Sequence, residues 1–134
     1  MDYRATQKFV VMSPKKIRYV SYAIKAMRPM DAVERLPFVS RRAAEPLAKV
    51  IKAAIANAKM QGAKESELIF KEIQIGEGPR LKRGRPRSRG MFHPYKKRMS
   101  HIRVVLTTKD EKVEKKEVKK ETKKVKAVVK KGKK

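Results

Sequence analysis

The chain contains no cysteine, so neither a disulfide framework nor a thiolate zinc site is available to it. Histidine is scarce as well, because His93 and His101 are too few for a metal site without clustered carboxylates. No stretch has the apolar core of a signal peptide or the length of a membrane span. We therefore expect a soluble protein that is not secreted and carries no metal or other cofactor.

Negative charge is also in short supply. The chain has 13 Asp or Glu against 38 Lys or Arg, which gives a formal net charge of +25 over 134 residues. Such a charge repels itself in a compact chain, so a polyanionic partner is expected, with nucleic acid ahead of an anionic membrane surface. The imbalance is greatest over residues 79–103, where ten side chains are basic and none is acidic.

The first part of the chain predicts a strand followed by a helix. Residues 3–12 alternate loosely between apolar and polar side chains, as in a half-buried strand. Ser13 as N-cap and Pro14 at the first helical position predict a helix that ends before Pro29. The buried stripe of this helix is expected to comprise Ile17, Val20, Ile24 and Met27.

Two further helices are predicted. Asp31 and Glu34 have the spacing of a capping box, which indicates the start of a short helix. A longer helical pattern covers residues 40–61 and is followed by Gly62 as a stop signal. Pro46 lies inside this pattern and should kink the helix or mark a restart. The apolar face of the long helix comprises Leu47, Val50, Ile51, Ala54 and Ala58.

Residues 68–75 and 101–107 are rich in β formers and predict two antiparallel strands. The segment between them, about 76–101, then forms the far part of one long β-hairpin. At about 3.3 Å per residue this hairpin reaches roughly 40 Å. A bare two-stranded ribbon is marginally stable in water, so an external scaffold is expected.

From Lys109 onward the composition changes to repeats of Lys, Glu and Val without aromatic residues. This pattern favours a disordered basic tail over residues 109–134. One domain, residues 1–108, therefore precedes the tail.

Catalytic constellations are poorly supported. Ser13 and Lys16 fit an S-x-x-K pattern, but the serine is placed to cap a helix and the companion motifs are missing. The segment "GEGPRLKRG" lacks the GK[ST] ending of a phosphate-binding Walker loop. Glu65, Glu67 and Glu72 are scattered rather than paired for acid–base work. We expect no catalytic site and no enzymatic activity.

The basic segment favours nucleic acid over the simpler alternative of a solvated charged face. Arginine outnumbers lysine over residues 80–89, which suits bidentate phosphate contacts and stacking on bases. Glycine and proline allow an irregular backbone path. Three rings are available to stack on unpaired bases, namely Phe92, His93 and Tyr95.

The order of these motifs resembles a known family. A strand is followed by "SPKKIRYV", by "AIANA" at 54–58, by "GEGPRLKRGRPRSRG" and by "KKRMSHIRVVL". Over about residues 3–108 this combination resembles the L-twenty-two family of large-subunit ribosomal proteins. The resemblance implies an α+β fold of about three helices on a three-stranded antiparallel sheet, with a long protruding β-hairpin.

The resemblance also implies a function. The chain would be a structural constituent of the large subunit of the cytoplasmic ribosome, binding large-subunit rRNA and supporting early subunit assembly. Its hairpin tip would line the polypeptide exit tunnel. The implied partners are rRNA, neighbouring large-subunit proteins and the nascent polypeptide, but neither a membrane nor a second copy of the chain.

The expected site residues fall into two groups. Carried over by position, the stem cations that contact rRNA are Arg80, Lys82, Arg83, Lys96, Lys97 and Arg98. The expected rRNA contacts outside the stem are Lys15, Lys16, Arg18, His101 and Arg103. The tip that would line the tunnel comprises Arg85, Pro86, Arg87, Ser88, Arg89, Gly90, Met91 and Phe92.

Two other classes stay open. A DNA-compacting protein is supported by the charge and the lysine-rich tail, although a loop of Arg, Gly and Pro suits irregular RNA better than uniform duplex DNA. An RNA-modifying enzyme would need a pocket with perturbed titratable groups, of which the sequence gives no sign.

Truncation after Thr108 tests the role assigned to the tail. Because the motifs that resemble the family all precede this residue, the shortened chain should still be incorporated into large ribosomal subunits almost as well as the full chain. Co-sedimentation with large subunits measures this. A truncated chain that no longer co-sediments would show that the tail takes part in docking.

Overall fold

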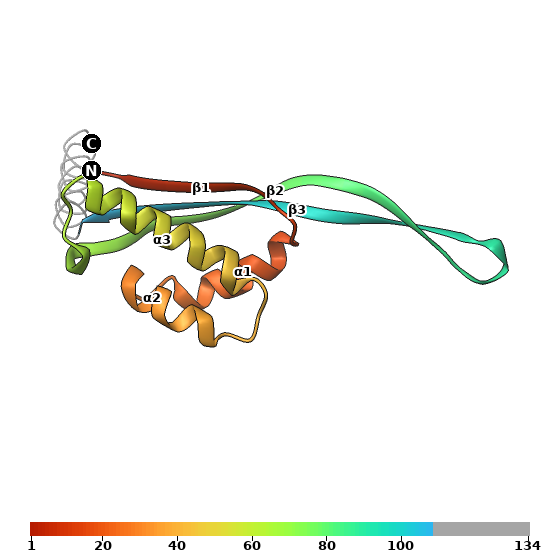
Figure 1. The fold of residues 1–134 in the computed structure, drawn as a ribbon, viewed down its shortest axis with the longest axis horizontal. Helices are drawn as coiled ribbons and strands as arrows, with labels where there is room; N and C mark the ends of the chain where they lie inside the picture. Colours follow the sequence, from red (N-terminus) through yellow and green to blue (C-terminus); the bar gives the residue numbers. More distant parts are fainter. Residues whose placement is uncertain (109–134) are drawn as a thin grey trace, which may run out of the picture.

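In the computed structural model, which describes residues 1–108, three antiparallel strands form one sheet in the order β1-β3-β2 and helices cover one face of it (Figure 1). The elements are β1 (Tyr3–Val10), α1 (Pro14–Ile24), α2 (Pro29–Arg35), α3 (Ala44–Met60), β2 (Leu68–Pro86) and β3 (Phe92–Thr108). This arrangement confirms the predicted α+β fold. The predicted tail, residues 109–134, lies outside the described residues.

The central strand β3 supplies the floor of the hydrophobic core. The side chains of Ile102, Val104 and Leu106 are fully buried on the face that the helices cover. Helix α3 packs across β1 and β3, and α1 packs against β2. Because each buried Leu or Ile contributes about 1.5–3 kcal/mol, this interface between helices and sheet is the main source of the domain's stability.

Helix α1 begins where the sequence predicts and ends earlier. Ser13 occupies the N-cap position with extended backbone, but its side chain makes no capping hydrogen bond. The helix ends at Ile24 rather than just before Pro29, so Met27 lies beyond its end and is half-buried. The other three residues of the predicted stripe, Ile17, Val20 and Ile24, are buried as expected.

The predicted capping box is wrong, because α2 begins two residues before Asp31. Pro29 takes the first helical position, where its fixed φ suits the helix and its missing N–H is not needed. Arg28, which precedes the proline, is held in the extended conformation and becomes the N-cap residue. Asp31 and Glu34 therefore lie inside the helix.

Helix α3 is continuous, so of the two outcomes predicted at Pro46 the kink is wrong, and the proline instead lies near the start of the helix. The helix begins at Ala44 rather than at Ser40, which places Pro46 in the first turn. Backbone N–H groups in the first turn have no partner within the helix, so proline removes nothing there. The predicted apolar face is confirmed, with Leu47, Val50, Ile51, Ala54 and Ala58 all buried.

Gly62 ends α3 as predicted. It has a φ of +80°, which glycine adopts without strain. The Gly62 amide donates to the Lys59 carbonyl at 2.9 Å, and the Ala63 amide donates to the Ala58 carbonyl at 3.0 Å. This pair of bonds is a Schellman motif. Nearby, the Asn57 side-chain amide donates to the Arg4 carbonyl at 3.0 Å and fastens α3 to strand β1.

Strands β2 and β3 continue far beyond the helices as one hairpin (Figure 1). Backbone pairing extends from Leu68↔Thr108 to Pro86↔Phe92, which confirms the long hairpin predicted for about residues 76–101. The pairing shifts register between Glu77 and Arg80. Pro79 lies in this irregularity, where the loss of its N–H costs little. The bulge between Glu77 and Arg80 thus marks the point where the hairpin projects from the three-stranded sheet.

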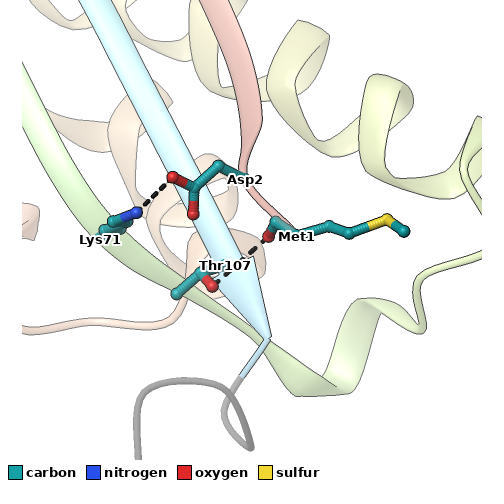
Figure 2. A network of polar contacts seen from close by, with 4 residues as sticks. All are labelled: Met1, Asp2, Lys71 and Thr107. Atoms are coloured by element: carbon teal, nitrogen blue, oxygen red, sulfur yellow. Dashed lines mark hydrogen bonds and ion pairs between the residues drawn. The ribbon is translucent and has the colours of Figure 1, made fainter. Parts of the chain in front are cut away.

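The N-terminus is fastened to the end of the sheet opposite the hairpin. Figure 2 shows Lys71 reaching Asp2, with which it forms an ion pair, and Thr107 reaching the backbone of Met1. The Thr107 hydroxyl donates to the Met1 carbonyl at 3.5 Å. Lys71 is the extra residue where the pairing of β2 shifts between Phe70 and Glu72. The bulge therefore places this lysine within reach of the N-terminus.

Deletion of residues 82–89 tests whether the domain folds without its hairpin tip. All of the buried core lies outside this segment, so the variant should keep the helical circular dichroism and the unfolding midpoint of the full chain. Ile51→Ala provides the comparison, since truncating this buried side chain should lower the free energy of unfolding by about 2–5 kcal/mol. Global unfolding of the deletion variant would show that the tip contributes to the core.

Candidate nucleic-acid interface

The stem of the hairpin places cations directly opposite one another. In the ladder between β2 and β3, Arg80 pairs with Arg98 and Lys82 pairs with Lys96. Like charges at opposite positions of an antiparallel pair destabilise it. Residues 79–103 contain no carboxylate that could offset this repulsion. The stem therefore carries a strong excess of positive charge along its length.

One carboxylate stands at the root of the stem. The Arg80 guanidinium donates to a carboxylate oxygen of Glu77 at 2.8 Å. This hydrogen bond, together with the charge of Arg80, lowers the pKa of Glu77 from its ordinary value, and the charges of Arg18 and Arg98 act in the same direction. Glu77 is exposed, so its lowered pKa reflects pairing with cations rather than an enclosed catalytic site.

The hairpin tip carries the predicted tunnel residues at the end farthest from the helices (Figure 1). The Phe92 ring lies over Gly84 so closely that any side chain at position 84 would overlap it. The Arg85 guanidinium lies 5.1 Å from the centre of the Tyr95 ring, in a cation–π contact. Phe92 is still 70% exposed. The tip is thus ordered by its own contacts and keeps its rings accessible.

A groove of about 820 Å³ lies where the stem meets the helical domain. We call it the basic groove, because seven cations and no carboxylate line it: Lys15, Lys16, Arg41, Arg42, Lys96, Lys97 and Arg98. They come from the start of α1, the turn before α3 and the first half of β3. Tyr19 completes the wall, with the Arg41 guanidinium 5.5 Å from the centre of its ring.

Arg41, Arg42 and Tyr19 are not among the contact residues predicted from the sequence. The "RR" pair was a visible signal, but it stands more than fifty residues from Lys96 in the chain. Only the packing of α1 and α3 on the sheet brings the two together. The exposed ring of Tyr19 lies on the side of α1 away from the core, which helical periodicity indicates but charge counting does not.

The remaining predicted contacts have different surroundings. Arg18 donates to the Ile75 carbonyl at 2.9 Å and so braces α1 against the root of the hairpin. His101 and Arg103 lie on the face of the sheet that no described helix covers, apart from the basic groove. Arg80, Lys82 and Arg83 are exposed along the stem. The predicted set therefore forms more than one surface.

These surfaces suit electrostatic binding of a polyanion. Over residues 1–108, no group of three or more His, Asp or Glu side chains lies close enough to hold a metal ion. In the same residues, no helix has the length and apolar character needed to cross a membrane. Arginine and lysine clustered in a groove and along strands form the kind of basic patch that is typical of nucleic-acid binding.

Comparison with known proteins agrees with this chemistry. The model of the family "Ribosomal protein L22p/L17e" matches residues 5–107. The large ribosomal subunit protein uL22 of Deinococcus radiodurans is 42% identical over 109 residues, which cover 81% of each chain. That of Desulfitobacterium hafniense strain Y51 is 40% identical over 109 residues, covering 81% of this chain and 96% of the relative.

A third relative is the large ribosomal subunit protein uL22 of Syntrophus aciditrophicus. It is 39% identical over 110 residues, which cover 81% of this chain and 100% of the relative. These matches confirm the resemblance inferred from the motifs, and with it the expectation that the chain is not an enzyme. They also agree with a place in the large subunit of the bacterial ribosome. The chain belongs to the L22p/L17e family of ribosomal proteins.

Proposed function

We propose that the hairpin stem and the basic groove bind large-subunit rRNA. The observation that carries this proposal is the pairing of like charges in the stem, Lys82 with Lys96 and Arg80 with Arg98, where Glu77 at the root is the one carboxylate that the described residues supply. Phosphates from RNA on both sides of the stem would turn this repulsion into attraction. A protein that makes six to ten phosphate contacts loses about 10³- to 10⁵-fold in affinity between 50 and 200 mM salt.

The same contacts would support early assembly of the large subunit. RNA segments that approach each other repel through their phosphates, and a narrow rod of cations between them removes that repulsion. The hairpin has the right form, because it projects alone from the domain (Figure 1). Its partners would be rRNA and neighbouring large-subunit proteins, and the chain would act as a single copy.

The tip would line the polypeptide exit tunnel. Residues 85–92 lie at the end of the hairpin, farthest from the domain, and they include exposed arginine and aromatic side chains. A hairpin that crosses folded rRNA can present its tip to a tunnel on the far side of that RNA. The nascent polypeptide would then be a passing partner of the tip rather than a bound one.

Lys96→Gln combined with Lys97→Gln tests the basic groove. Binding of the full chain to folded fragments of large-subunit rRNA is measured by gel shift over a salt titration. Each lost phosphate contact should reduce the steepness of log affinity against log salt by about 0.9. The double variant should therefore be flatter by nearly two units and weaker at low salt.

The matched control is Lys59→Gln combined with Lys64→Gln, which makes the same change in net charge near the end of α3, far from the hairpin (Figure 1). Both of these lysines are ion-paired with glutamates. The control should keep the salt dependence of the wild type. Equal losses in both variants, or equal wild-type affinity for duplex DNA, would favour a non-specific DNA-compacting protein instead.

Ribosomes that contain the 82–89 deletion test the tunnel role. Removing the tip should change behaviour that depends on the tunnel wall, such as sensitivity to macrolides, while the domain still docks. The measurement is the macrolide concentration that halves translation by purified deletion-variant and wild-type ribosomes. An unchanged sensitivity, with the variant present in the subunits, would contradict tunnel lining.

A further inference from the structure

A second hollow lies at the root of the hairpin, on the face of the sheet that no described helix covers. It has a volume of about 640 Å³ and is separate from the basic groove. We call it the root hollow, and its lining includes Lys8, Phe9, Gln74, Gly76, His101 and Arg103. Strands β1, β2 and β3 all contribute to it. The root hollow therefore combines the aromatic ring of Phe9 with cations and with side chains that can form hydrogen bonds.

The aromatic wall is held in place by a strained backbone. The pairing of β1 shifts between Gln7 and Val10, which leaves Lys8 and Phe9 in a bulge. Phe9 has a φ of +59°, a conformation that is costly for a bulky residue. Bulges re-aim side chains, and strain of this kind gathers at functional sites. Here the result is a phenylalanine ring that is 58% exposed at the hollow.

His101 fixes this bulge and faces the hollow with a defined chemistry. The Phe9 amide donates to Nδ1 of His101 at 3.0 Å, and the two rings meet edge to face with 5.0 Å between their centres. Because Nδ1 accepts a hydrogen bond, it carries no proton, and the imidazole proton resides on Nε2. His101 therefore offers the root hollow a neutral N–H donor.

The other groups complement that donor. The Gln74 side-chain amide donates to Glu72 at 2.6 Å, which leaves its carbonyl oxygen as an acceptor. Lys8 and Arg103 supply positive charge, and both are exposed. Gly76 pairs with His101 in the ladder, and a Cβ there would meet only the His101 Cβ, at 3.9 Å. A side chain at position 76 would fit the fold but would fill the hollow.

We propose that the root hollow binds one unpaired nucleotide of RNA, with its base stacked on Phe9. The base edge hydrogen-bonds with His101 and Gln74, and the phosphate lies against Arg103 and Lys8. This proposal rests on rRNA binding by the hairpin, because a single stacked base contributes only about 5- to 150-fold in affinity and needs neighbouring contacts to hold it there. Duplex RNA would not fit, since its bases are stacked on each other.

Phe9→Leu in the full chain tests the stack, because it removes the aromatic face and keeps an apolar side chain. The probe is a transcript of large-subunit rRNA, with affinity measured by filter binding over a salt titration. Phe9→Leu should weaken binding by at least about 5-fold without changing the salt dependence, since no cation is lost. Phe9→Tyr, which keeps the ring, should stay within about twofold of the wild type.

Two further variants make the test specific. Phe38→Leu makes the same substitution at a phenylalanine that is 89% exposed outside the root hollow, and it should bind like the wild type. Gly76→Val fills the hollow without removing charge, and it should weaken binding as Phe9→Leu does. Chemical probing of the rRNA transcript should show one unpaired base that is protected in the wild-type complex. The same base should react again in the Phe9→Leu complex. Thermal unfolding of each variant verifies that it is folded.

The outcomes separate this inference from the proposed function. If the wild type binds rRNA with a steep salt dependence but Phe9→Leu binds equally well, the nucleotide site is refuted and rRNA binding stands. Equal weakening by Phe38→Leu would also refute it. If the wild type shows no salt-dependent binding to the transcript, the proposed function itself fails. If Gly76→Val does not fold, the comparison of Phe9→Leu with Phe9→Tyr decides alone.

Discussion

The structure depends on the pairing register of strands β2 and β3. The hydrophobic core fixes this register in the sheet, and a bulge shifts it by one residue before the stem. Ile102, Val104 and Leu106 are buried on one face of β3, and a slip by one residue would turn all three to the other face. Beyond the bulge between Glu77 and Arg80 the pairing continues into the stem in a shifted register, which places Arg80 opposite Arg98 and Lys82 opposite Lys96. Strand pairing thus sets like charges opposite each other in the stem, and among the described residues only Glu77, which is ion-paired with Arg80, offsets them.

That coupling divides the molecule into two parts with different sources of order. The domain is stabilised by apolar packing of the helices on the sheet. In the hairpin, strand pairing orders the backbone as far as the tip. At the tip, the Phe92 ring covers Gly84 and the Arg85 guanidinium stacks on the Tyr95 ring. Among the described residues, Glu77 is the one carboxylate that pairs with the cations of the hairpin, through Arg80. In the function proposed above, the phosphates of rRNA supply the anions that these cations lack within the described residues.

The root of the hairpin, where the two parts meet, presents different chemistry on its two sides. The basic groove lies between the helices and the stem and offers many cations with a single ring, that of Tyr19. The root hollow lies on the helix-free face and offers an exposed ring, a neutral imidazole and an amide. The basic groove suits a run of RNA phosphates, and the root hollow suits a single base. Alternation of side chains along β3 makes both possible over a few residues.

The sequence by itself determined the elements, the apolar stripes of α1 and α3, the Gly62 stop and the stem cations, because periodicity and charge are local properties. It failed at Asp31 and Pro46, where the first turn of a helix depends on which residue starts it. Only the tertiary structure brought Arg41 and Arg42 to Lys96, and Phe9 to His101. Those contacts join segments fifty or more residues apart. They form because α1 and α3 pack on the sheet and β1 pairs with β3, and local sequence patterns do not show which elements pack or pair with each other.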